Sequence, residues 1–149
     1  MVIYRKKPDR THFLNVDLDI YSRSDLRPLV ATLGERVLVL FEGCIKRTYR
    51  AHVELSRVTK TPDATIKSFC SLISAMRRPS RDLWNRALRR DFNIGIQAEP
   101  APPYSCEFAL APETIKAASQ LGAGIVFTIY APGKNSTSSQ TKASRKLVR

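Results

Sequence analysis

The chain has 149 residues, with 25 Lys and Arg against 13 Asp and Glu, and a formal net charge of +12. Hydrophobic residues make up 43% of it, which is typical of a globular domain and excludes a chain that is disordered throughout. With 6 Gly and 3 Cys it is neither collagen-like nor a disulfide scaffold, and no apolar run approaches the ~20 residues of a membrane helix.

Most of the excess positive charge lies at the two ends of the chain. Residues 1–10 carry 4 basic residues and 1 acid, and residues 134–149 carry 5 basic residues and no acid. We therefore predict a basic N-terminal extension at 1–10, a single domain at 11–133 and a flexible, Ser/Thr-rich basic tail at 134–149. The basic start is not followed by an apolar segment, so we expect no secretory signal.

The first half of the domain shows clear strand and helix patterns. Residues 13–22 alternate between apolar and polar, which predicts a half-buried strand. A short helix is expected from the N-cap Asp25 to Gly34. Residues 37–41 are apolar on both faces, which is typical of a central strand, and residues 49–55 alternate again as a third strand.

The second half predicts three helices and three strands. Thr61-Pro62-Asp63 is a typical helix start, and a further helix covers 80–90, where Trp84 is expected to anchor it to the core. Strands are expected at 92–98, 104–110 and 124–131, with a helix from Pro112 to Gly122 between the last two. Cys106 falls on the apolar side of the strand expected at 104–110.

These elements give the order β-α-β-β-α-α-β-β-α-β. The sequence therefore predicts an α+β domain in which a mixed, mainly antiparallel sheet of about six strands packs against three to four helices.

Two stretches of the chain carry a resemblance to a group of known domains. FLNVDLDIYS followed by DLRPLVATLG, and the closing FALAPETIKAASQLGAGIVFTIYAP, resemble a group of small bacterial α+β domains of unknown function. The resemblance covers roughly 13–131 and implies a non-enzymatic binding protein of the immunity type. It carries over no catalytic residue, and the basic tail is not part of the pattern.

Polar side chains follow the first and third predicted strands. Asp17 and Asp19 project from one face of the first strand, and His52 and Glu54 project together from the third. If these strands are neighbours, three carboxylates and an imidazole share one surface, a set suited to acid–base chemistry or to a divalent metal. The simpler interpretation is a row of polar positions that face water.

The strongest local charge lies at 77–90. Six arginines accompany a single acid, Asp82, and we predict that they form an anion- or partner-binding face on a helix. The alternative is a solvated helix face that only keeps the domain soluble. The six are Arg77, Arg78, Arg81, Arg86, Arg89 and Arg90.

Cysteine and histidine are too sparse to predict a metal or cofactor site. Cys44, Cys70 and Cys106 are odd in number and widely spaced, which favours a reducing, cytoplasmic location, and there are only 2 His. There is no glycine-rich phosphate loop, so we expect no catalytic residue, no metal and no cofactor.

The sequence leaves three functions open. The first is a non-enzymatic bacterial binding protein, acting in the cytoplasm on a protein partner. The second is a nucleic-acid-associated protein that uses the arginines of 77–90 and the basic ends. The third is a small enzyme that uses the face of Asp17, Asp19, His52 and Glu54. Neither the ligand nor the oligomeric state follows from the sequence.

Overall fold

The computed structural model describes residues 10–133. In chain order its elements are β1 (His12–Ser22), α1 (Arg27–Leu33), a 3-10 turn (Gly34–Arg36), β2 (Val37–Ile45), β3 (Thr48–Leu55), α2 (Pro62–Ser74), α3 (Ser80–Arg86), β4 (Arg89–Gln97), α4 (Pro112–Gln120) and β5 (Gly124–Tyr130). The basic extension, apart from Arg10, and the predicted flexible tail at 134–149 lie outside the described residues.

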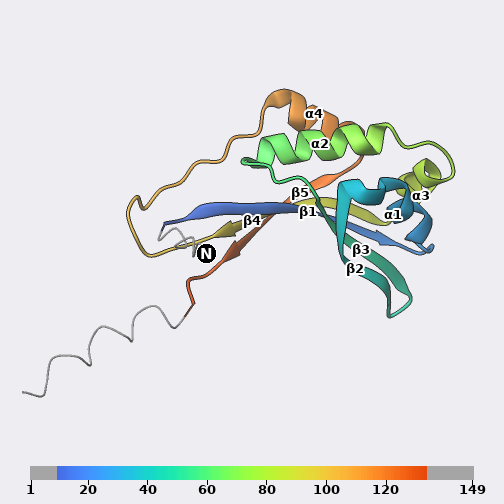
Figure 1. The fold of residues 1–149 in the computed structure, drawn as a ribbon, viewed down its shortest axis with the longest axis horizontal. Helices are drawn as coiled ribbons and strands as arrows, with labels where there is room; N and C mark the ends of the chain where they lie inside the picture. Colours follow the sequence, from blue (N-terminus) through green and yellow to red (C-terminus); the bar gives the residue numbers. More distant parts are fainter. Residues whose placement is uncertain (1–9, 134–149) are drawn as a thin grey trace, which may run out of the picture.

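The strands form one mixed sheet in the order β2-β3-β1-β4-β5. Three of its pairings are antiparallel, and only β4 and β5 run parallel. The four helices lie on one side of this sheet (Figure 1). The α+β class and the mixed, mainly antiparallel sheet are therefore confirmed, with four helices.

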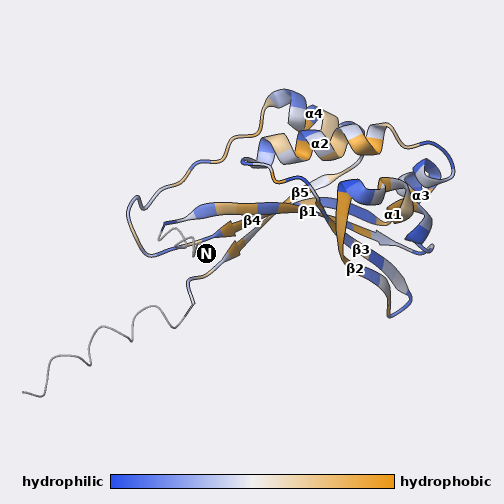
Figure 2. Ribbon diagram, in the orientation of Figure 1, coloured by the Kyte–Doolittle hydropathy of each residue, from blue (hydrophilic) through white to orange (hydrophobic). Residues whose placement is uncertain are grey.

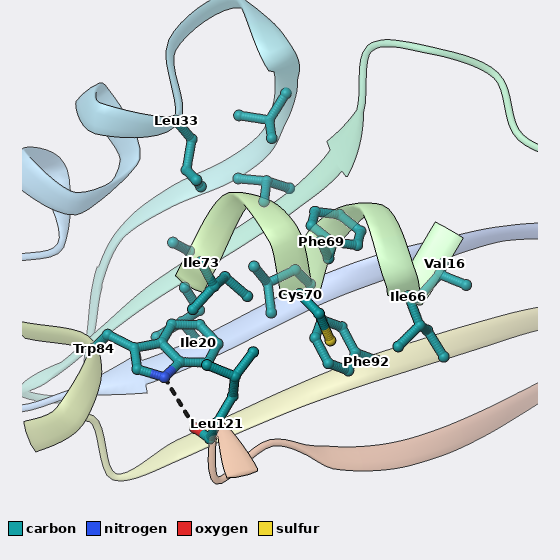
Figure 3. Close-up of a cluster of buried hydrophobic side chains, with 14 of the residues drawn as sticks. Val16, Ile20, Leu33, Ile66, Phe69, Cys70, Ile73, Trp84, Phe92 and Leu121 are labelled. Carbon is teal, nitrogen blue, oxygen red and sulfur yellow. Dashed lines mark hydrogen bonds between the residues drawn. The ribbon is translucent and has the colours of Figure 1, made fainter. Parts of the chain in front are cut away.

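The core lies between the helices and the covered face of the sheet. On β1, Val16, Leu18 and Ile20 are at most 1% exposed, as the alternation predicts. The ring of Phe69 on α2 stacks on that of Phe92 on β4 at a centroid distance of 5.8 Å (Figure 3). These contacts fasten the longest helix to the middle of the sheet.

Trp84 anchors α3 to the core, as expected from the sequence. Its side chain is fully buried, and its Nε1 donates a hydrogen bond of 3.0 Å to the carbonyl oxygen of Leu121 (Figure 3). Because Leu121 ends α4, this bond joins two helices that lie far apart in the sequence.

The start of α2 and the glycine stops of α1 and α4 follow the sequence signals, whereas the expected N-cap Asp25 is wrong: α1 begins at Arg27 with Leu26 as its N-cap. Thr61 caps α2 by accepting a 3.2 Å hydrogen bond from the backbone N–H of Ala64, with Pro62 as the first helical residue. Gly34 and Gly122 follow α1 and α4 with φ values of 58° and 69°, a region that favours glycine.

The expected sixth strand at 104–110 is wrong. This segment is irregular, Tyr104 is 85% exposed, and Cys106 is exposed rather than inward. A hairpin with β4, the strand before it in the chain, is blocked because β4 already has β1 on one side and β5 on the other. Its apolar residues make individual contacts with the domain instead of forming a strand. Phe108, for example, packs on Phe13 with their ring centroids 6.4 Å apart.

The expected central position of residues 37–41 is also wrong. They begin β2, which lies at the edge of the sheet and pairs with β3 alone. Leu38, Val39 and Leu40 are each about half exposed, and Figure 2 shows this part of β2 as a hydrophobic ribbon. An apolar run on both faces therefore marks exposed apolar surface here and not double coverage.

The helix expected at 80–90 ends at Arg86. Ala87 has an extended backbone, and the N–H of Leu88 donates a 2.7 Å hydrogen bond to the carbonyl oxygen of Tyr21 on β1. The chain is thus already aligned beside β1, and Arg89 and Arg90 belong to β4.

Candidate functional site

The face of the sheet opposite the helices carries a continuous set of polar and aromatic side chains. We call it the open face. In the register of the central strands, Asp17 lies opposite Glu54, and Asp19 lies opposite His52. The structure therefore brings together the four polar residues that the sequence singled out on the first and third strands.

Hydrogen bonds link the middle of this face across four strands. His52 Nδ1 donates to Asp19 Oδ1 at 2.6 Å, because an ionised carboxylate can only accept. Asn93 Nδ2 donates to the other oxygen of Asp19 at 3.4 Å, and Thr128 Oγ1 donates to Asn93 Oδ1 at 2.7 Å. The chain of bonds runs from β3 through β1 and β4 to β5.

A second cluster of acids lies one row along the same strands. Asn15 Nδ2 donates to Glu54 Oε2 at 2.6 Å and to Asp17 Oδ1 at 3.0 Å. Burial, together with the charges of Asp19 and Glu54, raises the pKa of Asp17 to about 6. The charge of His52 and the hydrogen bond from Asn15 oppose this shift of the pKa. Asp17 is thus a carboxyl group held in an environment that disfavours its charge.

Aromatic rings flank His52 on both sides. The imidazole lies 5.8 Å from the ring of Phe41 on β2 and 5.7 Å from that of Tyr21 on β1, measured between centroids. Phe41 remains 38% exposed. The three rings form a row across β2, β3 and β1 on the open face.

Two arginines lie beside this row. Arg50 on β3 and Arg89 on β4 are both register partners of Tyr21, and their guanidinium carbons lie 5.6 Å and 5.5 Å from the centre of its ring. Arg89 is also paired with Asp91. The Nε of Arg50 is buried and has no hydrogen-bond partner within residues 10–133. We call Tyr21, Phe41, Arg50, His52 and Arg89 the aromatic–arginine strip.

The six arginines of 77–90 do not form one face. Arg89 and Arg90 lie on β4, and only Arg81 and Arg86 lie on α3. Arg77 and Arg78 precede this helix, where Arg78 pairs with Asp82 at 3.5 Å.

Two of these arginines bind backbone carbonyls instead of presenting their charge. Arg81 Nη1 donates to the carbonyl oxygen of Ile73 at 2.9 Å, close to the end of α2. Arg90 Nη1 donates to that of Trp84 at 2.7 Å, and Arg90 Nε donates to that of Gly122 at 3.2 Å. Of the six, Arg77 and Arg86 are exposed and have no side-chain partner among residues 10–133.

Several site residues were missed by the sequence analysis. Asn15, Asn93 and Thr128 connect the carboxylates, and Tyr21 and Arg50 form the strip. The signal for Asn15 and Tyr21 was present, since both alternate in step with Asp17 and Asp19. Asn93 and Thr128 become neighbours only through the pairing of distant strands.

The arrangement offers a base but no assembled catalytic centre. A histidine oriented by a carboxylate is half of a nucleophile-activating set. However, both flanks of His52 are occupied by aromatic rings, and no Ser, Thr or Cys hydroxyl or thiol within residues 10–133 is hydrogen-bonded to it. No group of three His, Cys, Asp or Glu in the same residues is placed to hold a metal ion.

Most side chains of the strip and of the acid cluster are partly buried, and open pockets lie at both ends of the set: Arg50 contributes to the lining of one, and Asn15 and Glu54 to that of another. The pocket beside Asn15 and Glu54, of about 410 Å³, lies where β1 continues past the end of β3, and its lining also includes Leu38 and Val58. Within 10–133 no helix is long and apolar enough to cross a membrane. Comparison with known protein families, with curated proteins and with solved structures gives no match.

Proposed function

We propose that the protein is a non-enzymatic binding protein whose interaction surface is the open face of the sheet. The observation that carries this proposal is the acid–amide–histidine network, which spans four strands on a face that none of the four described helices covers. Side chains held in place by one another lose little conformational freedom when a partner binds, which favours recognition.

The composition of this face also favours binding over catalysis. Tyr, Phe and Arg are the side chains that most often dominate the energy of protein interfaces, and Tyr21, Phe41 and Arg50 lie together here. The perturbed carboxyl of Asp17 lies on the same face, beside Asn15 and Glu54, and perturbed pKa values concentrate at functional sites. The third function, a small enzyme on this face, has these carboxylates in its favour but lacks a placed nucleophile.

The resemblance to bacterial domains of the immunity type supports the same proposal, with a protein as the partner. A cytoplasmic location is part of it, because Cys44, Cys70 and Cys106 are all free, as in a reducing compartment. Binding experiments therefore belong in a reducing buffer, which keeps these thiols free.

A capture experiment with matched variants tests the proposal. The immobilised full chain is compared with Phe41→Ala/Glu54→Ala on the open face and with Glu113→Ala/Ile115→Ala, an equivalent acid and apolar pair exposed on α4. We expect a partner from the native host to be retained by the wild type and by the α4 variant and lost by the open-face variant. Equal capture by all three proteins would contradict the proposal.

A second candidate function is association with nucleic acid. The sequence placed it on the arginines of 77–90, and those side chains are dispersed over α3, the segment before it and β4, with two of them engaged with carbonyl oxygens. The aromatic–arginine strip is the specific observation that supports association with nucleic acid, and it lies on the sheet instead of on α3.

A further inference from the structure

We propose that the aromatic–arginine strip binds single-stranded nucleic acid, with a base on the ring of Phe41 and phosphates at its arginines. This inference rests on the proposed function only in taking the open face to be the binding surface, and it names single-stranded nucleic acid as the occupant in place of a protein. It differs from the sequence-based hypothesis because it assigns no role to α3.

The first argument is the geometry of the rings. Phe41, His52 and Tyr21 follow one another at 5.8 Å and 5.7 Å across three neighbouring strands. Phe41, at the end of this row, is 38% exposed, whereas guanidinium groups lie over the ring of Tyr21. Proteins that bind single strands without reading a sequence stack bases on such exposed rings, since every base has an aromatic face. An open sheet face suits this mode, because single-stranded bases can be splayed out over it.

The second argument is the distribution of positive charge. Arg50 and Arg89 flank Tyr21, and the end of the sheet where they lie also carries three exposed cations. Lys46 and Arg47 form the turn between β2 and β3, and Arg23 follows β1 directly. A guanidinium group both pairs with phosphate and stacks on a base, so this end of the face offers both contacts.

The third argument is the unsatisfied donor on Arg50. Its Nε is buried without an acceptor in residues 10–133, although a buried donor normally finds one. Acids lie close by, but they are already occupied: Asp19 accepts from His52 and Asn93, and Asp91 is paired with Arg89. Arg50 therefore keeps an unsatisfied donor at this end of the strip, and of the strip's two arginines it is the one without an acid partner among residues 10–133.

The test measures the affinity of the full chain for a labelled single-stranded RNA of about ten nucleotides, a length within the range of known single-strand sites. Arg50→Gln/Arg89→Gln is compared with Lys60→Gln/Lys116→Gln, which removes the same charge from exposed positions away from the strip. Phe41→Ala is compared with Ile115→Ala, which removes an exposed apolar side chain from α4. Thermal unfolding of each variant confirms that it is folded, and Arg50→Lys/Arg89→Lys keeps the charge without the planar group.

We expect the loss of Arg50 and Arg89 to lower the slope of log affinity against log salt by about 1.4, since each phosphate contact on a single strand contributes about 0.7. Phe41→Ala should weaken binding about tenfold without changing that slope, as expected for a lost stacking contact. Both controls should bind nearly as the wild type does. A duplex of the same sequence should bind more weakly, because its bases are not available to stack.

Three results would overturn the inference. Equal losses in strip and control variants would mean that the chain binds RNA by its overall charge. An acidic peptide that competes with the RNA and shows the same dependence on Arg50 and Phe41 would mean a protein partner. Absence of RNA binding at low salt would reject the inference outright. Capture of a partner that depends on the open face, without RNA binding, would leave the proposed function standing, whereas the failure of both experiments would remove both.

Discussion

Replacing Asp17 by asparagine should stabilise the protein at neutral and alkaline pH. The folded state raises the pKa of this carboxyl from 3.8 to about 6, chiefly through burial and through the charges of Asp19 and Glu54. Because the folded pKa is the higher one, the stability that this group contributes is fully present below pH 3.8 and is lost as the pH rises through 6. Above that window the ionised group disfavours the folded state.

The size of the effect follows from the shift. Each pKa unit corresponds to roughly 1.4 kcal/mol, so a shift of about two units sets an upper limit of about 3 kcal/mol at pH 8. The asparagine side chain would keep an oxygen that can accept the hydrogen bond from Asn15 and would remove the charge. We therefore expect Asp17→Asn to raise the free energy of unfolding by roughly 1–3 kcal/mol at about pH 8 and by almost nothing at about pH 4.

Urea unfolding at several pH values checks this expectation. Trp84 is the single tryptophan and is fully buried, so its fluorescence reports the loss of the core. Asp82→Asn is the control, because the Asp82 side chain is 43% exposed and its ion pair with Arg78 should contribute little. A loss of stability at pH 8, or a gain of the same size at both pH values, would show that the charge of Asp17 is not the destabilising feature.

Three further predictions concern contacts that stabilise the fold. Asp63 accepts hydrogen bonds from Thr114 and from the N–H of Ala111, and these bonds, together with Lys67, hold its pKa at about 2. Asp63→Asn should therefore lower the free energy of unfolding, measured by urea titration, by about 1–2 kcal/mol near pH 7 and by less as the pH falls toward 2. Trp84→Phe leaves a buried carbonyl oxygen without its donor and should cost about 1–3 kcal/mol in thermal unfolding, a smaller loss being evidence for a substitute donor. Arg90→Ala should lower the free energy of unfolding by about 1–3 kcal/mol, because Arg90 donates to the carbonyl oxygen of Trp84, whereas Arg86→Ala should change it by less than about 0.5 kcal/mol. Equal effects of the two substitutions in chemical unfolding would contradict this role of Arg90.

Local patterns predicted most of the secondary structure, because several of its features depend only on residues that are neighbours in the sequence. The alternation in β1 and the cap at Thr61 are properties of a few adjacent residues, and both are found as expected. Pairing partners are not local. Residues 37–41 and 104–110 both read as strands, yet one lies at the edge and the other pairs with nothing, since β4 is already flanked by β1 and β5.

The candidate site was predictable to the same extent. The alternation of polar residues placed Asp17 with Asp19 and His52 with Glu54, and one antiparallel pairing joined the two sets. The partners that hold these groups come from β4 and β5, which follow much later along the chain. No local pattern indicates that Asn93 will donate to Asp19, since that contact depends on the register of β1 with β4.

The arginines show why a count of charges is a poor guide to a binding surface. A guanidinium group has five donors, and the ends of helices leave carbonyl oxygens without partners, so an arginine near a helix end readily fills that need. Arg81 and Arg90 do so, and a third arginine, Arg89, is paired with an acid. Arg50 alternates with His52 and Glu54 on the third strand but was not singled out as a site residue, yet its buried Nε is left without an acceptor in residues 10–133. The charge available to a partner is therefore set by which carbonyls and acids the fold brings within reach of each arginine. Of the six arginines of 77–90, Arg77 and Arg86 keep exposed charges without a partner among residues 10–133, and Arg50 on β3 keeps a donor without an acceptor.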